Sequence, residues 1–282
     1  MSDAGDQGLA ARLRAVGCVF AEEEAAEIRR VLGAADPSAV VAARARGVPL
    51  EQALGRARFA GVDVEVGPGV FVPRHRAAVL VGAAAEAAPA ARIAVDLGCG
   101  SGAIAAALTR RLPHAAVHAC DIDRAAVTTA ARNGAIFGFV AHHGGWWEAL
   151  PGSLLGRIDL AVAYLPHVPT RLLGTIPRDF REHEPAGTVD GGFDGLDPFR
   201  AVLAGAPRWL AGDGVLVTLV AGEQVPAALA TAGGWRVEVR AGLPDDADTG
   251  GDDDGPSGAG GEEGDEPDDA VLVLRRRPTS PH

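Results

Sequence analysis

Short apolar runs alternate with longer stretches of helical periodicity over most of this chain. The apolar runs predict strands at 93–97, 117–121, 159–163 and 215–220, with a shorter strand near 236–239 and a last strand at 270–274. The helical spacing of apolar residues predicts helices at 103–112, 124–137 and 198–210. Strands that alternate with helices in this way are typical of an α/β protein with a doubly wound parallel sheet.

The first sixty residues have a different pattern, which predicts several short helices. Leu13, Val16 and Phe20 begin an apolar stripe that residues 22–32 continue. We therefore expect a small helical module over residues 1–60, ahead of a larger domain.

A change of pattern marks the start of the larger domain. Apolar and polar residues alternate over 62–66 and are followed by Gly67-Pro68-Gly69, which predicts a hairpin strand and a turn. We expect the α/β domain to extend over residues 61–282.

Composition narrows the class of protein. The chain has 282 residues, of which 48% are hydrophobic and 22% charged, as in ordinary globular proteins. No apolar run of about 18 residues lacks charge or proline, so no membrane span is expected. The polar, acidic start is unlike a secretory signal, and the three cysteines are an odd, widely spaced set. We expect reduced thiols and a cytoplasmic protein.

The net charge of −11 comes from one segment. Residues 245–269 hold twelve Asp or Glu and no Arg, so the rest of the chain is nearly neutral. A segment rich in Gly, Asp and Glu cannot bury a core, which predicts a disordered acidic insertion. No basic stripe with interleaved aromatic residues is present, and a nucleic acid partner is not expected.

The clearest chemical signal is the stretch 94–102, which reads AVDLGCGSG. An apolar strand leads through Asp96 into three glycines at alternate positions, and a helical pattern follows. Glycine lets the backbone turn tightly and approach a ligand, because it has no Cβ. Asp121 ends the next expected strand, where an acid typically accepts the hydroxyls of a ribose. This succession of strand, acid, glycines, helix, strand and acid predicts a nucleotide-type site. Its G-x-G-x-G spacing differs from the G-x-G-x-x-G motif of dinucleotide-binding sites.

This arrangement resembles the S-adenosylmethionine site of a class I methyltransferase. The expected cofactor-binding residues are Asp96, Gly98, Cys99, Gly100, Gly102, Asp121, Ile122 and Trp146. Two alternatives stay open. Asp96 either contacts the amino group of the cofactor or caps the following turn. Trp146 and Trp147 pack either over the adenine or in a helix–sheet interface.

Motifs outside the glycine loop resemble a narrower family. They are GVPLE at 47–51, FVPR at 71–74, HEP at 183–185, DGGFDGLD at 190–197 and Gln224. In this order they look like the HemK/PrmC-type protein-(glutamine-N5) methyltransferases, from about residue 10 to residue 275 apart from the acidic segment. The resemblance implies a Rossmann-like class I methyltransferase fold with a small N-terminal helical domain that helps to dock the substrate. It also implies S-adenosylmethionine as cofactor and, as acceptor, the glutamine of a Gly-Gly-Gln loop in a release factor.

The expected catalytic residues are Tyr164, Leu165, Pro166 and His167, which stand where the family has Asn-Pro-Pro-Tyr. In the family, the Asn side-chain oxygen and the next backbone carbonyl accept the two N–H bonds of the glutamine amide and orient its nitrogen. Tyr164 cannot reproduce an amide oxygen, so glutamine methylation is expected to be slower by about 10²–10³. Tyr164 and His167 either form a new proton-accepting pair or fill the space left by Asn and Tyr.

Several other side chains have two interpretations. Glu148 is a candidate for the acid that relatives carry near the adenine amine. Arg74 either holds an acidic group at the mouth of the site or forms a structural salt bridge. Four further histidines are expected on the surface or in loops, and no metal is expected, because no Cys/His set has ligand spacing. They are His114, His118, His142 and His143.

Three functions remain open on the sequence. The first is methylation of a release-factor glutamine, and the second is methylation of a small molecule or of another side chain. The third is a non-catalytic binding module that keeps the fold.

Overall fold

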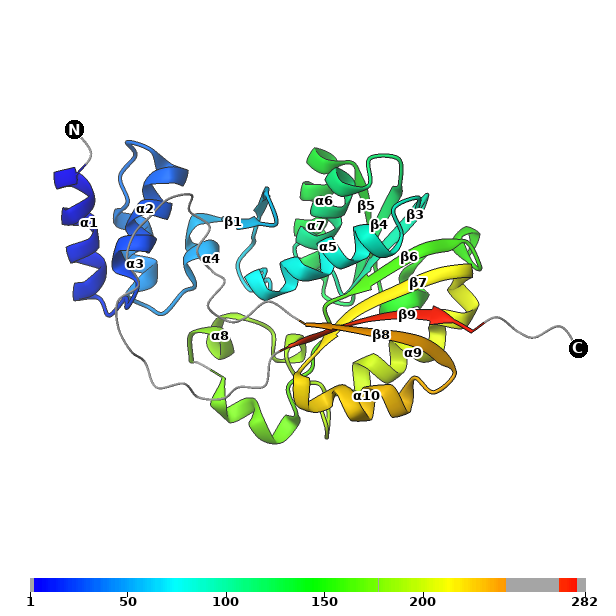
Figure 1. The fold of residues 1–282 in the computed structure, drawn as a ribbon. Helices are drawn as coiled ribbons and strands as arrows, with labels where there is room; N and C mark the ends of the chain where they lie inside the picture. The colour runs from blue at the N-terminus through cyan, green and yellow to red at the C-terminus, as the bar shows by residue number, and fades with distance from the viewer. Residues whose placement is uncertain (1–2, 177, 242–268, 278–282) are drawn as a thin grey trace, which may run out of the picture.

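A seven-stranded sheet lies at the centre of the molecule, in the order β5-β4-β3-β6-β7-β9-β8 (Figure 1). The computed structural model describes residues 3–176, 178–241 and 269–277. Neighbours from β5 to β7 are parallel, whereas β9 runs antiparallel to both β7 and β8. The strands are β3 Ile93–Leu97, β4 Ala116–Asp121, β5 Phe139–His143, β6 Ile158–Ala163, β7 Leu210–Val220, β8 Trp235–Ala241 and β9 Ala270–Arg276.

Helices cover both faces of the sheet (Figure 1). One face carries α5 (Ala78–Ala87), α6 (Ala103–Arg111) and α7 (Arg124–Phe137), and the other carries α9 (Asp197–Trp209) and α10 (Val225–Thr231). Side chains alternate across a strand, so Ala94 packs in the first layer while Val95 and Leu97 pack in the second. The predicted α/β fold with a doubly wound sheet is confirmed.

The antiparallel direction of β9 was not expected. A parallel neighbour needs a crossover connection, usually a helix, whereas an antiparallel one does not. The sequence between β8 and β9 has no amphipathic helical pattern, which is consistent with the antiparallel pairing. The predicted acidic insertion at 245–269 lies outside the described residues, except for Asp269.

A two-stranded hairpin precedes the main sheet. It consists of β1 (Arg56–Phe59) and β2 (Val62–Glu65). The strand expected at 62–66 is therefore present, but its partner comes before it, through a turn at Ala60-Gly61 with positive φ at both residues. The hairpin crosses residue 60, and the division of the chain into domains at that position stays a prediction.

The edge strand β5 was not predicted, and neither was the pairing of His118 with His142 across β4 and β5. Its sequence ends in His142-His143, which does not look like a core strand. His118 on β4 and His142 on β5 are half-buried and stacked, with His118 Nδ1 and His142 Nε2 3.0 Å apart. The expectation that these two lie on the surface or in loops was wrong, because they pair across neighbouring strands.

The N-terminal helices have a small core of their own. They are α1 (Asp3–Ala15), α2 (Ala21–Leu32), α3 (Ser38–Arg44) and α4 (Leu50–Leu54). Leu13 and Ile28 are fully buried in this core, whereas Phe20, at the start of α2, is 67% exposed and does not continue the predicted stripe. None of the described helices is long and apolar enough to cross a bilayer.

Short helices complete the fold between these elements. They are η1 His75–Ala77, η2 Trp146–Ala149, η3 Gly152–Leu154, η4 Thr170–Thr175, α8 Arg178–His183, η5 Ala186–Thr188 and η6 Gly222–Gln224.

Asn133 joins three elements beneath the glycine loop. Its side chain is fully buried on α7. Asn133 Oδ1 accepts a hydrogen bond from Glu65 N at 2.8 Å, and Nδ2 donates to Glu65 O at 3.0 Å and to Ser101 O at 2.8 Å. The amide thus fixes β2 and the glycine loop against the same helix.

We expect Asn133→Ala to lower the free energy of unfolding by about 2–4 kcal/mol, because three backbone groups lose their partner in a buried place. Urea unfolding measures this change. The control is Thr128→Ala on the exposed side of α7, whose hydroxyl donates only to Arg124 O. A loss for Asn133→Ala no larger than that of the control would contradict the role of the amide.

Candidate functional site

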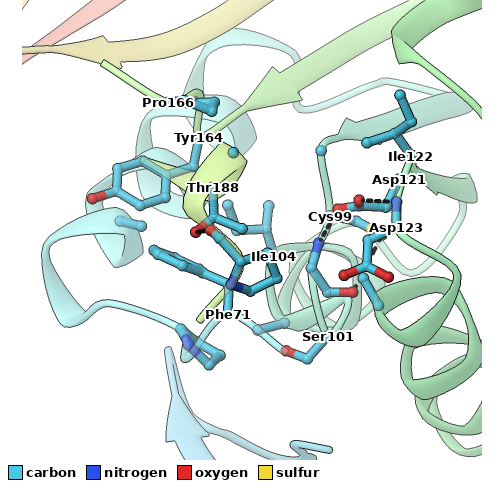
Figure 2. A pocket seen from close by; sticks show the side chains of 18 of the residues that line it. Phe71, Cys99, Ser101, Ile104, Asp121, Ile122, Asp123, Tyr164, Pro166 and Thr188 are labelled. Carbon is cyan, nitrogen blue, oxygen red and sulfur yellow. Dashed lines mark hydrogen bonds between the residues drawn. The ribbon is translucent and has the colours of Figure 1, made fainter. Parts of the chain in front are cut away.

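A cavity of about 290 Å³ lies at the carboxyl ends of β3, β4 and β6 (Figure 2). The chain runs from β3 to β4 and β5 on one side and from β6 to β7 on the other, so the order of strands reverses here. Such a reversal is where open α/β sheets bind ligands. One wall is formed by Gly98, Cys99, Gly100, Ser101, Asp121, Ile122, Asp123 and Trp146. The facing wall includes Phe71, Pro73, Arg74, Tyr164, Pro166, Pro185, Thr188 and Asp190.

One carboxylate holds the two loops of the first wall together. Asp121 Oδ2 accepts a hydrogen bond from Gly100 N at 2.8 Å, and Oδ1 accepts one from Asp123 N at 2.9 Å (Figure 2). Burial raises the pKa of Asp121, and the N–H groups partly oppose this by stabilising the charged form. Each carboxylate oxygen accepts more than one hydrogen bond, so both retain capacity toward the cavity.

The three glycines of the loop have different roles. All have positive φ, between 54° and 80°, which favours glycine. A Cβ on Gly98 would lie 3.0 Å from the Trp146 ring, and one on Gly100 would only touch Phe71 at 3.9 Å. A Cβ on Gly102 would lie 2.6 Å from Phe139 Cζ. Contrary to its prediction as a cofactor residue, Gly102 does not line the cavity, and it packs α6 against β5.

Asp96 lies beneath the loop and not in the cavity wall. It is fully buried, and its Oδ2 accepts a hydrogen bond from Ala105 N at 3.1 Å in the first turn of α6. This contact matches the capping alternative. Burial raises the pKa of Asp96 to about 7.

Two buried oxygens at the loop lack a hydrogen-bond partner in the described part of the chain. They are Asp96 Oδ1 and Ser101 Oγ, and Ser101 lines the cavity. Buried polar atoms are normally paired, so such orphans call for an explanation. A ligand with hydrogen-bond donors, such as the amino group of the predicted cofactor, fits the Ser101 hydroxyl and the open cradle beside Gly100.

The two adjacent tryptophans take opposite directions. Trp146 lines the cavity, with a left-handed backbone at φ 43°, and its carbonyl accepts a hydrogen bond from Cys120 Sγ at 3.2 Å. Trp147 is buried in the core, stacks on Trp209 and donates to Val202 O at 2.8 Å. Only Trp146 is therefore placed to touch a ligand.

Two further expectations concern the rim of this wall. Ile122 lines the cavity and is largely exposed, as a residue that covers a ligand would be before binding. Glu148 is exposed and does not line the cavity. Its suggested place near an adenine amine stays a prediction.

The four expected catalytic residues divide into two pairs. Tyr164 and Pro166 line the cavity, whereas Leu165 and His167 do not. The Leu165 side chain is buried in the core, because successive residues in an extended segment point to opposite sides. His167 packs against the Tyr164 ring, with ring centroids 5.7 Å apart.

Hydrogen bonds and burial limit which polar groups of residues 164–167 can contact a substrate. The Tyr164 hydroxyl points away from Cys99 and Asp121 (Figure 2), and burial raises its pKa to about 12, so it stays protonated. His167 Nδ1 bonds to Leu165 O at 2.8 Å and must be the protonated nitrogen, because a carbonyl only accepts. Burial lowers the pKa of His167. The Leu165 carbonyl therefore already accepts one hydrogen bond.

Arg74 makes a salt bridge at the edge of the facing wall. Its Nη2 lies 2.6 Å from Glu184 Oε2, and its guanidinium lies 4.5 Å from the centroid of Phe71. Glu184 Oε1 also accepts a hydrogen bond from Val72 N at 3.0 Å, and burial raises the Glu184 pKa. The salt-bridge alternative for Arg74 is observed, although Arg74 also lines the cavity.

Several wall residues were not identified from the sequence. Phe71, Pro185 and Asp190 lie inside the motifs FVPR, HEP and DGGFDGLD, so the motifs located them without indicating their direction. Thr188 and Ile104 carry no sequence signal, because their place depends on how η5 and α6 pack.

Comparison with known proteins identifies similar chains. The family described as methyltransferase small domain matches residues 64–142. A release factor glutamine methyltransferase from Geobacter sulfurreducens is 40% identical over 176 residues, which cover 61% of this chain and 60% of that protein. This chain thus spans less than two thirds of that relative's length. A release factor glutamine methyltransferase from Streptomyces coelicolor is 36% identical over 203 residues, covering 70% of this chain and 72% of that protein.

A solved structure has the same fold. It is a methyltransferase from Pyrococcus furiosus, with a TM-score of 0.51 and 13% sequence identity, covering 76% of this chain and 89% of that one.

Because the carboxyl of Asp96 is buried, we expect the free energy of unfolding to depend on pH. The folded-state pKa of this carboxyl, about 7, lies above the ordinary value of 3.8. Between these values the folded protein binds more protons than the unfolded chain, so stability falls as pH rises. We expect the unligated protein to lose about 2–3 kcal/mol between pH 5 and pH 8 relative to Asp96→Asn.

Urea unfolding at both pH values measures the difference, with Asp213→Asn on the exposed start of β7 as the control. Parallel pH profiles for the wild type and Asp96→Asn would show that Asp96 ionises normally in the folded protein.

Proposed function

Since this chain belongs to the release factor glutamine methyltransferase family, we propose that it is an S-adenosylmethionine-dependent methyltransferase that acts on a protein side chain. The first candidate acceptor is the glutamine of a Gly-Gly-Gln loop in a release factor. The observation that carries the proposal is the cavity at the strand-order reversal, with the glycine loop and Asp121 on one wall and the Tyr164 loop on the other.

The first wall has the groups that a bound adenosyl cofactor needs. Asp121 would hold the ribose hydroxyls, the Gly98–Gly100 backbone and Ser101 would hold the amino-acid part, and Ile122 and Trp146 would flank the base. When bound, S-adenosylmethionine supplies a methyl group activated by a positively charged sulfur. Phe71, Tyr164 and Pro166 then enclose the acceptor and exclude water from it.

A different acceptor is favoured by the geometry of the second wall. A glutamine amide has two N–H donors, and orienting it needs two acceptors. Tyr164 directs its hydroxyl away from the glycine loop and has no amide oxygen, so the Leu165 carbonyl, which keeps one lone pair beside its bond to His167, is the one expected acceptor that is left. The second candidate is therefore another side chain or a small molecule that does not depend on paired acceptors. A fold retained only for binding is the third function that stays open.

Asp121→Ala is expected to weaken S-adenosylmethionine binding at least about tenfold, because it removes the ribose acceptor and frees the Gly100 amide. Isothermal titration measures the dissociation constant. Asp213→Ala, at the opposite end of the sheet, should bind like the wild type. No binding by the wild type at millimolar cofactor would favour the non-catalytic alternative.

Tyr164→Asn is expected to raise methylation of a Gly-Gly-Gln release factor by about 10²-fold, because the Asn oxygen restores one acceptor for the amide. Mass spectrometry of the glutamine peptide measures the rate. Tyr164→Phe removes only the hydroxyl and should bring no gain. A wild-type rate equal to that of Tyr164→Asn would show that the natural loop already orients glutamine.

A further inference from the structure

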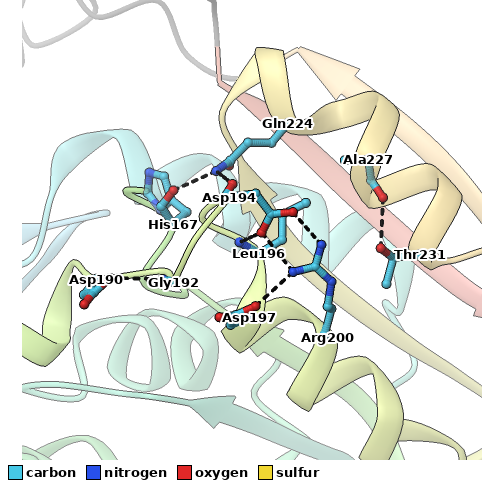
Figure 3. Close-up of polar contacts among 10 residues, drawn as sticks. All are labelled: His167, Asp190, Gly192, Asp194, Leu196, Asp197, Arg200, Gln224, Ala227 and Thr231. Atoms are coloured by element: carbon cyan, nitrogen blue, oxygen red, sulfur yellow. Dashed lines mark hydrogen bonds and ion pairs between the residues drawn. The ribbon is translucent and has the colours of Figure 1, made fainter. Parts of the chain in front are cut away.

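The side chain of Gln224 connects three segments at the carboxyl end of β7 (Figure 3). Gln224 lies in η6, just after β7, and is 5% exposed. Its Nε2 donates to His167 O at 2.7 Å and to Asp194 O at 3.1 Å, and its Oε1 accepts from Ala221 N at 3.0 Å. A single amide thus ties the loop after β6 and the loop before α9 to the end of β7.

The loop before α9 is shaped around this amide. Gly195 has a φ of 81°, and a Cβ there would lie 2.1 Å from Gln224 Nε2 and 2.2 Å from His167 O. A Cβ on Gly191 would lie 2.6 Å from Gly195 O. The same loop is held from the other side by Arg200, whose guanidinium contacts both carboxylate oxygens of Asp194 at 2.6 and 2.9 Å (Figure 3). The backbones therefore approach as closely as glycine permits.

These contacts extend to the wall of the cavity through the acceptor loop, which we define as residues 164–169. Gly191 N donates to Val168 O at 2.8 Å, and Val168 N donates to Val189 O at 3.0 Å. Gln224 Nε2 donates to the carbonyl oxygen of the residue before Val168, which is His167. The ring of His167 donates in turn to Leu165 O. Gln224 itself does not line the cavity, so its effect on a ligand must pass through this loop.

We propose that Gln224 is a positioning residue that sets the place of the acceptor loop, and so of Tyr164 and Pro166, relative to the glycine loop. Burial alone does not require an amide here, since an apolar side chain fills the same space. The amide is needed because two carbonyls from different segments converge on it, and without a donor they are left unpaired and repel each other. Its effect on the rate rests on the proposed methyl transfer, whereas its effect on the loop does not.

Tyr164 is the only tyrosine in the chain, which gives a direct probe of loop position. Protein labelled with fluorotyrosine has one fluorine NMR resonance, from the acceptor loop. We expect Gln224→Met, an apolar side chain of similar length, to shift or broaden that resonance. Thr231→Ala is the matched control, because it removes a hydrogen bond to Ala227 O on the neighbouring α10 and should leave the resonance unchanged.

Cofactor titration and kinetics separate positioning from a general loss of structure. For Gln224→Met we expect an unchanged S-adenosylmethionine dissociation constant and a kcat at least about tenfold lower, because a small misplacement of the acceptor loop is costly. Gly195→Ala should shift the resonance similarly, and the two changes should not add, since they disturb one contact. If Gln224→Met does not fold, Gln224→Glu replaces it, because it keeps the acceptor for Ala221 N and lacks the donors.

A wild-type resonance in the folded Gln224 variant would overturn the proposal. So would a cofactor affinity that falls as much as kcat, since the defect would then not be confined to the acceptor loop. If the wild-type protein transfers no methyl group to any acceptor, the proposed function fails, and the fluorine spectra alone decide the role of Gln224.

Discussion

The whole candidate site depends on the Asp121 carboxylate that joins two loops at the end of the sheet. It accepts one backbone N–H from the glycine loop and one from the start of the segment leading into α7. Both loops follow parallel strands, so their ends meet at the same edge. The positive φ of Gly98 and Gly100 keeps the backbone clear of the space between them. This contact adds to the hydrogen bonds that Gly98 N and Cys99 N donate to Cys120 O, each at 2.9 Å, at the base of the same two loops.

The two walls of the cavity match the family pattern to different degrees. The wall formed by the glycine loop and Asp121 has the glycines and the strand-end acid that the family resemblance implies, but not the acid expected near the adenine amine. The facing wall has Tyr164 where an amide is expected, with its hydroxyl directed away from the glycine loop. Around that change, the supports of the loop remain: the Gln224 amide, Gly195 and the Arg200–Asp194 ion pair. Under the proposed function, the supports that would position the acceptor loop are present, while Tyr164 differs from the residue that the family pattern implies for orienting glutamine.

Much of the fold could be predicted from the sequence because its core strands are apolar and its helices periodic. The helix at 124–137 begins and ends where it was expected. The edge strand β5 was missed because it is short and ends in two polar residues, His142 and His143, and the direction of β9 depends on a connection without a helical pattern. The site was located by glycine spacing and strand-end acids. Spacing does not tell which residues face the cavity, so Gly102, Asp96, Leu165 and His167 needed the packing to be assigned.

The central claim is that this cavity holds an adenosyl ligand between the glycine loop and Asp121. A crystal structure of the protein with S-adenosylhomocysteine, the demethylated form of the cofactor, tests it most directly. The account predicts ribose oxygens within hydrogen-bond distance of the Asp121 carboxylate and the amino-acid end beside Ser101, on the glycine-loop wall. Density for the ligand elsewhere, or a cavity closed by Trp146 or Phe71 at saturating ligand, would contradict it.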